Sequence, residues 1–210
     1  MSESPLAGQT ALVTGGARRA GRAIVEAFLA EGARLCEELA KTLTPQCVLY
    51  TQQALARYPR IGQLAGEQFV LAPHVAEKLA GTQNTQGVFA VFALPRPDPA
   101  QLVRAGGRWL YLENVQDPAN VGALLRSAAA FGFDGVLLSP GCADVFSAKA
   151  LRASMGAAGR IPVCEEVPVE TAAQLGRAAG LAVLAAALHN AVPLESAPSP
   201  QHGVLLLIGN

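Results

Sequence analysis

Short apolar runs alternate with helical segments throughout the second half of the chain, and this alternation constrains the fold more than any other feature. We expect helices at 119–131, 147–155 and 171–179. The apolar runs predict strands at 108–112, 135–139, 161–163, 182–187 and 203–208. Strands that alternate with helices build βαβ units, which form parallel sheets covered by helices. Residues 106–210 therefore predict a Rossmann-like, mainly parallel sheet in an α/β fold.

A second, smaller α/β unit is predicted before this sheet. Its expected helices are 35–43, 52–58 and 74–79, and its expected strands are 46–50, 68–71 and 88–93. A proline-rich stretch at 94–99 follows and marks the clearest boundary, since such sequences act as extended spacers. We therefore divide the chain into a leader (1–27), a compact α/β domain (28–94), a linker (95–105) and the large domain (106–210).

The composition is that of a folded protein, with 51% hydrophobic and 15% charged residues. Its formal net charge of +0 argues against a strongly basic, non-specific nucleic-acid binder, but it allows recognition of RNA by a local patch. The four cysteines are widely spaced and no histidine stands at metal-ligand spacing, so we expect neither disulfides nor a metal site. With no secretory signal or membrane span expected, a cytoplasmic location is predicted.

The segment 112–132 carries the strongest indication of chemistry. A strand leads into a polar turn at 113–118, and the following helix carries Asn120, Gly122 and Arg126. A strand's carboxyl end and the start of the next helix form the usual ligand crevice of α/β sheets, and helix N-termini favour anions. Arg126 lies in an otherwise apolar helix. From spacing alone it could equally be a surface arginine, or one paired with Glu113 or Asp117.

The string Asn120-x-Gly122-x-x-x-Arg126-x-Ala128-x-x-Phe131-Gly132, preceded by Asp117-Pro118, resembles the first signature motif of the SpoU (TrmH-like) RNA ribose methyltransferases. Residues 137–144 and 147–157 resemble the next strand, loop and helix of that family. Residues 28–35 resemble the opening strand and turn, and residues 86–91 the last strand, of the small RNA substrate-binding domain that precedes many SpoU catalytic domains. The resemblance covers about residues 28–210.

This resemblance implies transfer of a methyl group from S-adenosylmethionine to a ribose 2′-hydroxyl of a structured RNA, either rRNA or tRNA. Arg126 is implied as the catalytic residue, with Asn120 fixing the loop or the substrate backbone. Arg152 and Ser154 are candidates for RNA contact, although helix capping and surface charge explain them equally well. The cofactor pocket is implied at Ala186 and Ala187 in one strand and at Gly209 in another.

The family pattern continues beyond residue 210 with a Glu-Gly pair, a Ser-Leu-Asn segment and a deep knot. We therefore expect the chain to lack the knot-forming C-terminus, which would impair cofactor binding and activity. The apolar run 204–208 suits the interior of a sheet, yet no following helix is present in the sequence to cover it. The family usually dimerises through the knotted region, so a homodimer is expected for the complete fold but is doubtful here.

The leader resembles another family. A strand at 10–14, a glycine-rich turn with Gly15, Gly16 and Gly21, and a helix expected at 20–30 resemble the cofactor loop of short-chain dehydrogenases over residues 9–35. The Tyr-x-x-x-Lys motif of that family is absent. We therefore interpret the chain as a chimera that joins segments of the two families. Two alternatives to a methyltransferase follow: a non-catalytic RNA-binding remnant, and an NAD(P)-binding reductase fragment.

Overall fold

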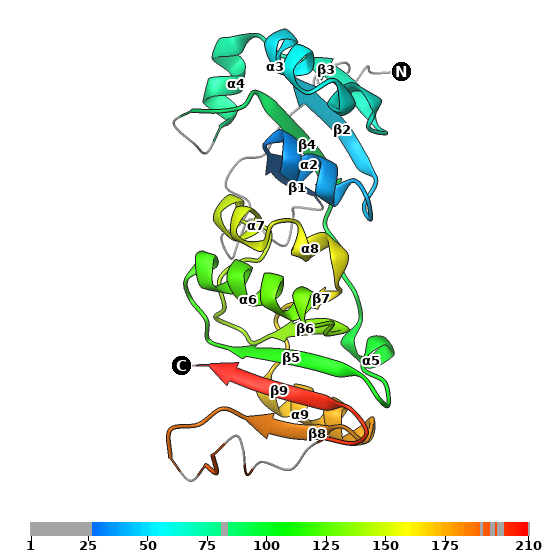
Figure 1. The fold of residues 1–210 in the computed structure, drawn as a ribbon, viewed down its shortest axis with the longest axis vertical. Helices are drawn as coiled ribbons and strands as arrows, with labels where there is room; N and C mark the ends of the chain where they lie inside the picture. Colours follow the sequence, from blue (N-terminus) through cyan, green and yellow to red (C-terminus); the bar gives the residue numbers. More distant parts are fainter. Residues whose placement is uncertain (1–26, 81–83, 190, 194–195, 197–199, 210) are drawn as a thin grey trace, which may run out of the picture.

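The computed structural model describes residues 27–80, 84–189, 191–193, 196 and 200–209. Two sheets follow one another along the length of the molecule (Figure 1). The predicted α/β fold class is confirmed, as is the order of a small unit followed by a mainly parallel sheet. No helix within these described ranges is long and apolar enough to cross a membrane.

The small sheet has four strands in the order β1-β4-β2-β3. Only β2 and β3 pair in parallel, and the other pairs are antiparallel. The helices α2, α3 and α4 and the 3-10 helix η1 connect these strands. The elements are β1 (Ala27–Glu31), α2 (Ala33–Leu39), β2 (Pro45–Tyr50), α3 (Gln52–Arg57), η1 (Pro59–Gln63), β3 (Glu67–Val70), α4 (Pro73–Leu79) and β4 (Val88–Ala93).

The strand β1 corrects the helix predicted at 20–30. Residues 27–30 are extended and all five residues of β1 pair with β4. Phe28 and Ala30 are buried while their neighbours are half-buried, which is the period-two pattern of a strand. The remainder of that predicted helix lies outside the described residues. The apolar residues of 27–31 fit the helical period as well as the strand period, so the pairing with β4 decided the conformation.

The large sheet has five parallel strands in the order β7-β6-β5-β9-β8. The run 204–208, predicted as an interior strand, lies in β9 between β5 and β8. Two short helices were not predicted: α5 within the expected linker, and α8 after α7. The elements are α5 (Pro99–Leu102), β5 (Arg108–Glu113), α6 (Pro118–Ala130), β6 (Gly135–Leu138), α7 (Ala148–Ser154), α8 (Ala157–Arg160), β7 (Val163–Cys164), α9 (Val169–Ala178), β8 (Ala182–Ala185) and β9 (Val204–Gly209).

Helices cover both faces of this sheet, and the central strand β5 shows how the sequence allows it. Leu110 and Leu112 face the side of α6, where they join one buried cluster with Leu125. Trp109 and Tyr111 point the other way, into a second cluster on the side of α9. Side chains alternate across a strand, so a nearly continuous apolar run supplies two cores at once.

The two units share one hydrophobic core. Helix α2 packs against α8, and β1 packs against α7 (Figure 1). Phe28 of β1 lies 4.8 Å from Phe146, measured between ring centroids, and so joins the loop before α7 to the small sheet. A Cβ added at Gly159 of α8 would lie 2.8 Å from Leu39 Cδ2 of α2. The helices approach closely because this position is glycine.

We expect the stability of the protein to fall at alkaline pH through Cys36. Its side chain is fully buried, and burial raises the pKa of the Cys36 thiol to about 12 from its ordinary value of 9.0. Between these two values the unfolded chain loses a proton that the folded chain retains, so the free energy of unfolding decreases as the pH rises. Urea denaturation at about pH 8 and about pH 11 measures this slope.

The variant Cys36→Ala is the control for this prediction. It leaves a small cavity, which lowers the stability by a similar amount at every pH. The variant should therefore lose less stability than the wild type between the two pH values. Equal losses in the two proteins would show that Cys36 does not contribute to the slope.

Candidate functional site

The topology of the large sheet points to one edge as the place for a ligand. From β5 the chain first crosses to β6 and β7, and then returns to β8 and β9 on the other side. The direction therefore changes between β5 and β9, where Glu113 and Gly209 are paired in register. Ligands of open α/β sheets bind outside the carboxyl ends of the strands at such a switch point.

The loop that leaves β5 is held firmly at this edge. Asn114 has a left-handed φ of 51°, and its backbone N–H donates to Ser139 Oγ at 2.9 Å. The thiol of Cys142 accepts from the N–H of Val115 and donates to the carbonyl of Leu112, both at 3.3 Å. Strand β6 and its loop thus fix the chain before α6, so the start of that helix has a defined position.

Helix α6 begins at this loop with a well-formed N-terminal cap. Asp117 accepts the N–H of Ala119 at 2.9 Å, and Pro118 occupies the first turn. Lys149 Nζ of α7 also donates to Asp117, at 2.8 Å. The Lys149 hydrogen bond, followed by that of Ala119, lowers the pKa of the Asp117 carboxyl. Asp117 therefore stays ionised and is engaged by two partners.

Asn120 and Arg126 lie on one exposed row of α6. Both are solvent-exposed, and Ala123, also exposed, is three residues from each. Residues three apart are neighbours on a helix surface, so the small Ala123 leaves open space between the two polar side chains. Within the described residues the Arg126 guanidinium has no hydrogen bond or ion pair. Asp117 forms its ion pair with Lys149, so the ion pair between Asp117 and Arg126 that the sequence allowed is not observed.

Gly122, a fixed position of the motif, has a packing role that the sequence did not indicate. A Cβ added there would lie 2.4 Å from the carbonyl oxygen of Ala150 and 2.6 Å from the Cβ of Ala153, both on α7. Real Cβ atoms are not found so close to backbone atoms. Glycine therefore lets α6 and α7 touch at their backbones, which sets the position of the Asn120–Arg126 row.

The expected cofactor positions lie at the same sheet edge. Ala186 follows β8, and its N–H donates to the carbonyl of Leu207 on β9 at 2.9 Å. Ala186, Ala187 and Gly209 are all exposed. A Cβ at Gly209 would lie 2.4 Å from the Cβ of Glu113, so close packing of strands also explains this glycine. These exposed residues therefore place little side-chain volume at the strand ends.

Two residues of α7 were predicted to contact RNA, and the structure separates them. Ser154 is fully buried and its hydroxyl donates to the carbonyl of Leu151 at 2.8 Å. A side chain with no exposed surface cannot contact RNA, so the prediction for Ser154 is corrected to a structural role. Arg152 is exposed and its Nη1 lies 3.7 Å from Glu31 Oε2 of the small unit.

A pair of residues that sequence reasoning passed over lies at the switch point. The buried Tyr111 hydroxyl is 2.9 Å from Glu113 Oε2 and 3.1 Å from the carbonyl of Val167. Burial, and then the hydrogen bond to Glu113, raise the pKa of Tyr111. The available signal was their spacing, because residues two apart in a strand share one face. Tyr111 therefore orients the Glu113 carboxylate at the edge where β5 meets β9.

Taken over the described residues, no three His, Cys, Asp or Glu side chains are placed to hold a metal ion. The site is instead built from a free guanidinium, an amide, an oriented carboxylate and open strand ends. Such a set can bind a polar substrate and stabilise negative charge.

Comparisons with known proteins agree with this geometry. Residues 108–210 match the SpoU rRNA Methylase family, and residues 17–90 match the MRM3-like substrate binding domain. The chain is 29% identical over 185 residues to the 23S rRNA guanosine 2′-O-methyltransferase RlmP of Bacillus subtilis, covering 87% of this chain and 71% of RlmP. It is 30% identical over 195 residues to an uncharacterised tRNA/rRNA methyltransferase of Mycobacterium tuberculosis, covering 90% of this chain and 67% of that protein.

Among solved structures, the SpoU methyltransferase AviRb of Streptomyces viridochromogenes in complex with the cofactor AdoMet is similar. Its TM-score is 0.79 at 27% identity, over 92% of this chain and 77% of that chain. The comparisons give no support to the dehydrogenase-like interpretation of residues 9–35, since the substrate-binding match begins at residue 17. Gly15, Gly16 and Gly21 lie outside the described residues. The family matches and the 30% identical relative together place this chain in the SpoU rRNA methylase family.

Proposed function

We propose that this protein transfers a methyl group from S-adenosylmethionine to a ribose 2′-hydroxyl of RNA. The observation that carries the proposal is the Arg126 guanidinium, which has no partner among the described residues and shares an exposed helix row with Asn120 beside the switch point of a parallel sheet. Relatives that are named as rRNA or tRNA methyltransferases support the same reaction.

A ribose 2′-hydroxyl is a poor nucleophile, and the residues of the protein must promote its reaction. The ribose oxygen forms a bond to the methyl carbon while the carbon–sulfur bond breaks, and the hydroxyl proton leaves. Arg126 stays protonated, so its role is to stabilise the negative charge that develops on this oxygen. The proton passes to solvent or to a phosphate of the substrate. Asn120, on the other side of Ala123 in this row, would hold the substrate backbone through its amide.

Cofactor binding is proposed at the carboxyl ends of β8 and β9. S-adenosylmethionine supplies an electrophilic methyl group on a sulfonium. Ala186, Ala187 and Gly209 fit such a ligand, because these exposed residues carry little side-chain volume that would block it. The AdoMet-bound AviRb, which has a similar fold, supports the choice of this cofactor. Glu113, whose carboxylate bonds Tyr111, is paired in register with Gly209.

In this proposal the two units have different roles. Residues 28–94 would recognise a structured rRNA or tRNA, and 106–210 would carry out the methyl transfer. The match of 17–90 to a substrate-binding domain supports the first assignment. The cytoplasmic location, and a homodimer for the complete family fold, remain predictions from the sequence.

A methyl-transfer assay tests this function. The chain is incubated with rRNA or tRNA and S-adenosylmethionine labelled on its methyl group, at several cofactor concentrations. We expect labelled RNA whose methylated ribose resists alkaline hydrolysis, since the 2′-oxygen is blocked. RNA binding without label at any concentration would favour the non-catalytic RNA-binding alternative. A response to NADPH, with no binding of RNA, would favour the reductase fragment.

A further inference from the structure

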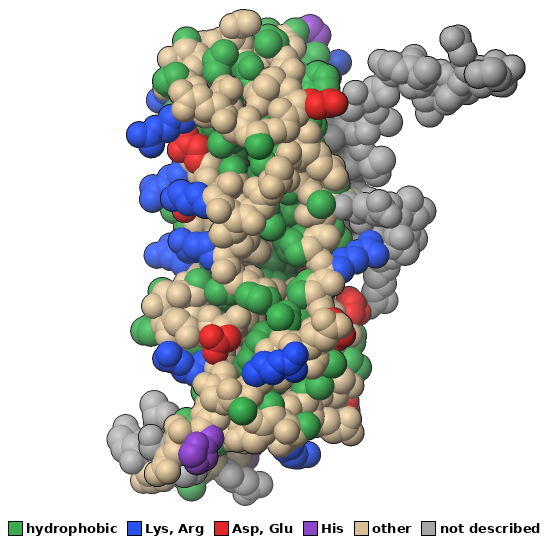
Figure 2. All heavy atoms as spheres, turned by 90° about the vertical axis from the view of Figure 1, so that its right-hand side faces the viewer, with side chains coloured by type: hydrophobic (Ala, Val, Ile, Leu, Met, Phe, Trp, Pro, Cys, Tyr) green, Lys and Arg blue, Asp and Glu red, His purple; other side chains and the backbone are tan. Residues whose placement is uncertain are grey.

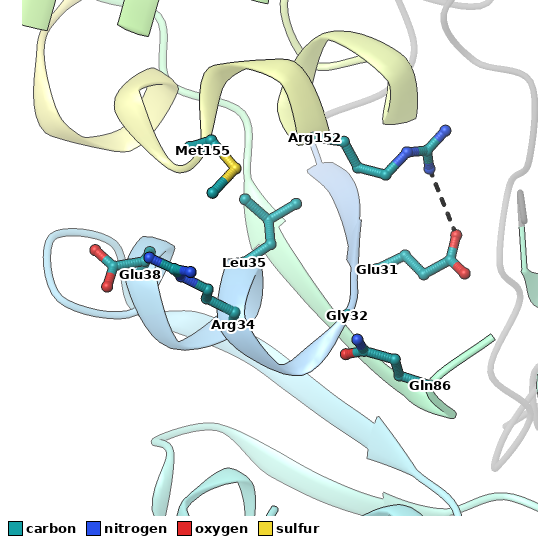
Figure 3. A pocket seen from close by; sticks show the side chains of 8 residues that line it. All are labelled: Glu31, Gly32, Arg34, Leu35, Glu38, Gln86, Arg152 and Met155. Atoms are coloured by element: carbon teal, nitrogen blue, oxygen red, sulfur yellow. Dashed lines mark ion pairs between the residues drawn. The ribbon is translucent and has the colours of Figure 1, made fainter. Parts of the chain in front are cut away.

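A pocket lies between the two units. It has a volume of about 280 Å³ and is bounded by β1 and α2 on one side and by the end of α7 on the other (Figure 3). We call it the α2–α7 pocket. Leu35 and Met155 form its apolar surface, and its polar groups come from Glu31, Arg34, Glu38, Gln86 and Arg152.

The apolar part of the pocket is open to a ligand. Met155 is 42% exposed, although it is a large hydrophobic side chain, and Figure 3 shows it beside Leu35 in the middle of the pocket. A flat, partly exposed apolar surface between two arginines suits an aromatic ring, because bases stack on apolar side chains and on guanidinium planes. The volume is at the lower end for ligand sites, which fits one base better than a larger molecule.

The charges inside the pocket balance. Two arginines, Arg34 and Arg152, face two carboxylates, Glu31 and Glu38, so a phosphate would meet as much repulsion as attraction. A nucleobase is neutral and carries both donors and acceptors on its edge. Carboxylates accept from its amino and imino groups, while guanidinium and amide groups donate to its ring nitrogens and carbonyl oxygens.

The rim of the pocket is more basic than its interior. Lys41 Nζ bonds Glu38 Oε1 at 2.6 Å. This bond, and the nearby charges of Lys41, Arg160 and Arg34, lower the pKa of Glu38. Figure 2 shows Lys and Arg side chains in a column along the left edge of the molecule. Basic groups outside a neutral pocket suit a strand whose phosphates stay at the surface while one base enters.

Helix α7 places this pocket next to the methyl-transfer site. Lys149 pairs with Asp117, the cap of α6, and Arg152, one helical turn further on, lies against Glu31 of the pocket. Both ends of α7 therefore contact elements that would hold RNA.

We propose that the α2–α7 pocket holds one unpaired nucleobase of the substrate RNA, at a position other than the nucleotide that is methylated. Guanine is the preferred base, because it offers adjacent donors to a carboxylate and acceptors to a guanidinium. The proposal rests on the proposed function, since it assumes that RNA is the substrate.

Binding of short abasic RNAs tests the proposal. Each fluorescent probe has abasic flanking residues and carries guanine, uracil or no base at its centre. We expect the guanine probe to bind the full chain about tenfold more tightly than the probe without a base, with uracil between them. The variant Met155→Glu should abolish the difference, because it places a carboxylate on the apolar surface. Met155→Leu should retain it.

The control variant Arg177→Ala removes one exposed positive charge from α9, on the opposite face of the large sheet. It should preserve the preference for guanine. Equal binding of all three probes to the wild type, or an unchanged preference in Met155→Glu, would overturn the proposal. This assay contains no cofactor and measures binding alone. A preference for guanine in a chain that fails the methyl-transfer assay would count against the proposed function but support the pocket.

Discussion

Replacing Arg126 by alanine is expected to lower the rate of methyl transfer by about 10²–10³-fold, the usual loss when one group that stabilises an oxyanion is removed. The guanidinium is exposed and has no partner within the described part of the chain, so the substitution should leave the fold intact. Binding of RNA should change little, because the stabilising interaction forms mainly as charge develops on the ribose oxygen. The rate is measured at saturating cofactor and RNA, together with the dissociation constant for RNA.

Two further variants make this prediction specific. Arg126→Lys keeps the charge but loses the planar fork of donors, so we expect a rate between those of the wild type and Arg126→Ala. Arg177→Ala removes a comparable exposed arginine on α9 and should keep the wild-type rate. If Arg126→Ala retained full activity, or if both alanine variants lost it equally, the proposed role of Arg126 would be wrong.

The second large effect is expected on stability, at Gly122. The variant Gly122→Val would force side-chain carbon against the backbone of α7, where a Cβ already lies 2.4 Å from the carbonyl oxygen of Ala150. Overpacking of this kind lowers the free energy of unfolding by about 1–3 kcal/mol. In a protein of this size, each 1 kcal/mol lowers the Tm by about 2–4 °C. Thermal unfolding followed by circular dichroism measures the change.

The neighbouring variant Ala123→Val is the matched control for helix propensity. Ala123 is exposed on the same helix, so valine there changes the intrinsic helix preference but meets no facing backbone. We expect it to unfold close to the wild-type temperature. Similar losses in Gly122→Val and Ala123→Val would mean that the contact between α6 and α7 does not require glycine.

Most elements could be predicted from the sequence because their apolar pattern fitted only one type of secondary structure. The strand 88–93 has the predicted bounds, and α6 differs from its prediction by one residue at each end. Where the apolar pattern was short, the prediction of the element failed. Residues 27–30 were expected in a helix and form β1, because pairing with β4 outweighs local preference. The helices α5 and α8 have four residues each, too few to show a helical period.

The sequence by itself determined the parallel α/β class and a methyltransferase motif with Asn120 and Arg126, since both depend on residue types at fixed spacing. Only the tertiary structure decided which candidate residues are available. It buries Ser154 and pairs Lys149 with Asp117, and it provides no partner for Arg126 among the residues that it describes. It also joins β1 and α2 to α7, which forms the α2–α7 pocket. Burial, ion pairing and pockets between units depend on contacts between segments distant in the chain, and no local pattern records those contacts.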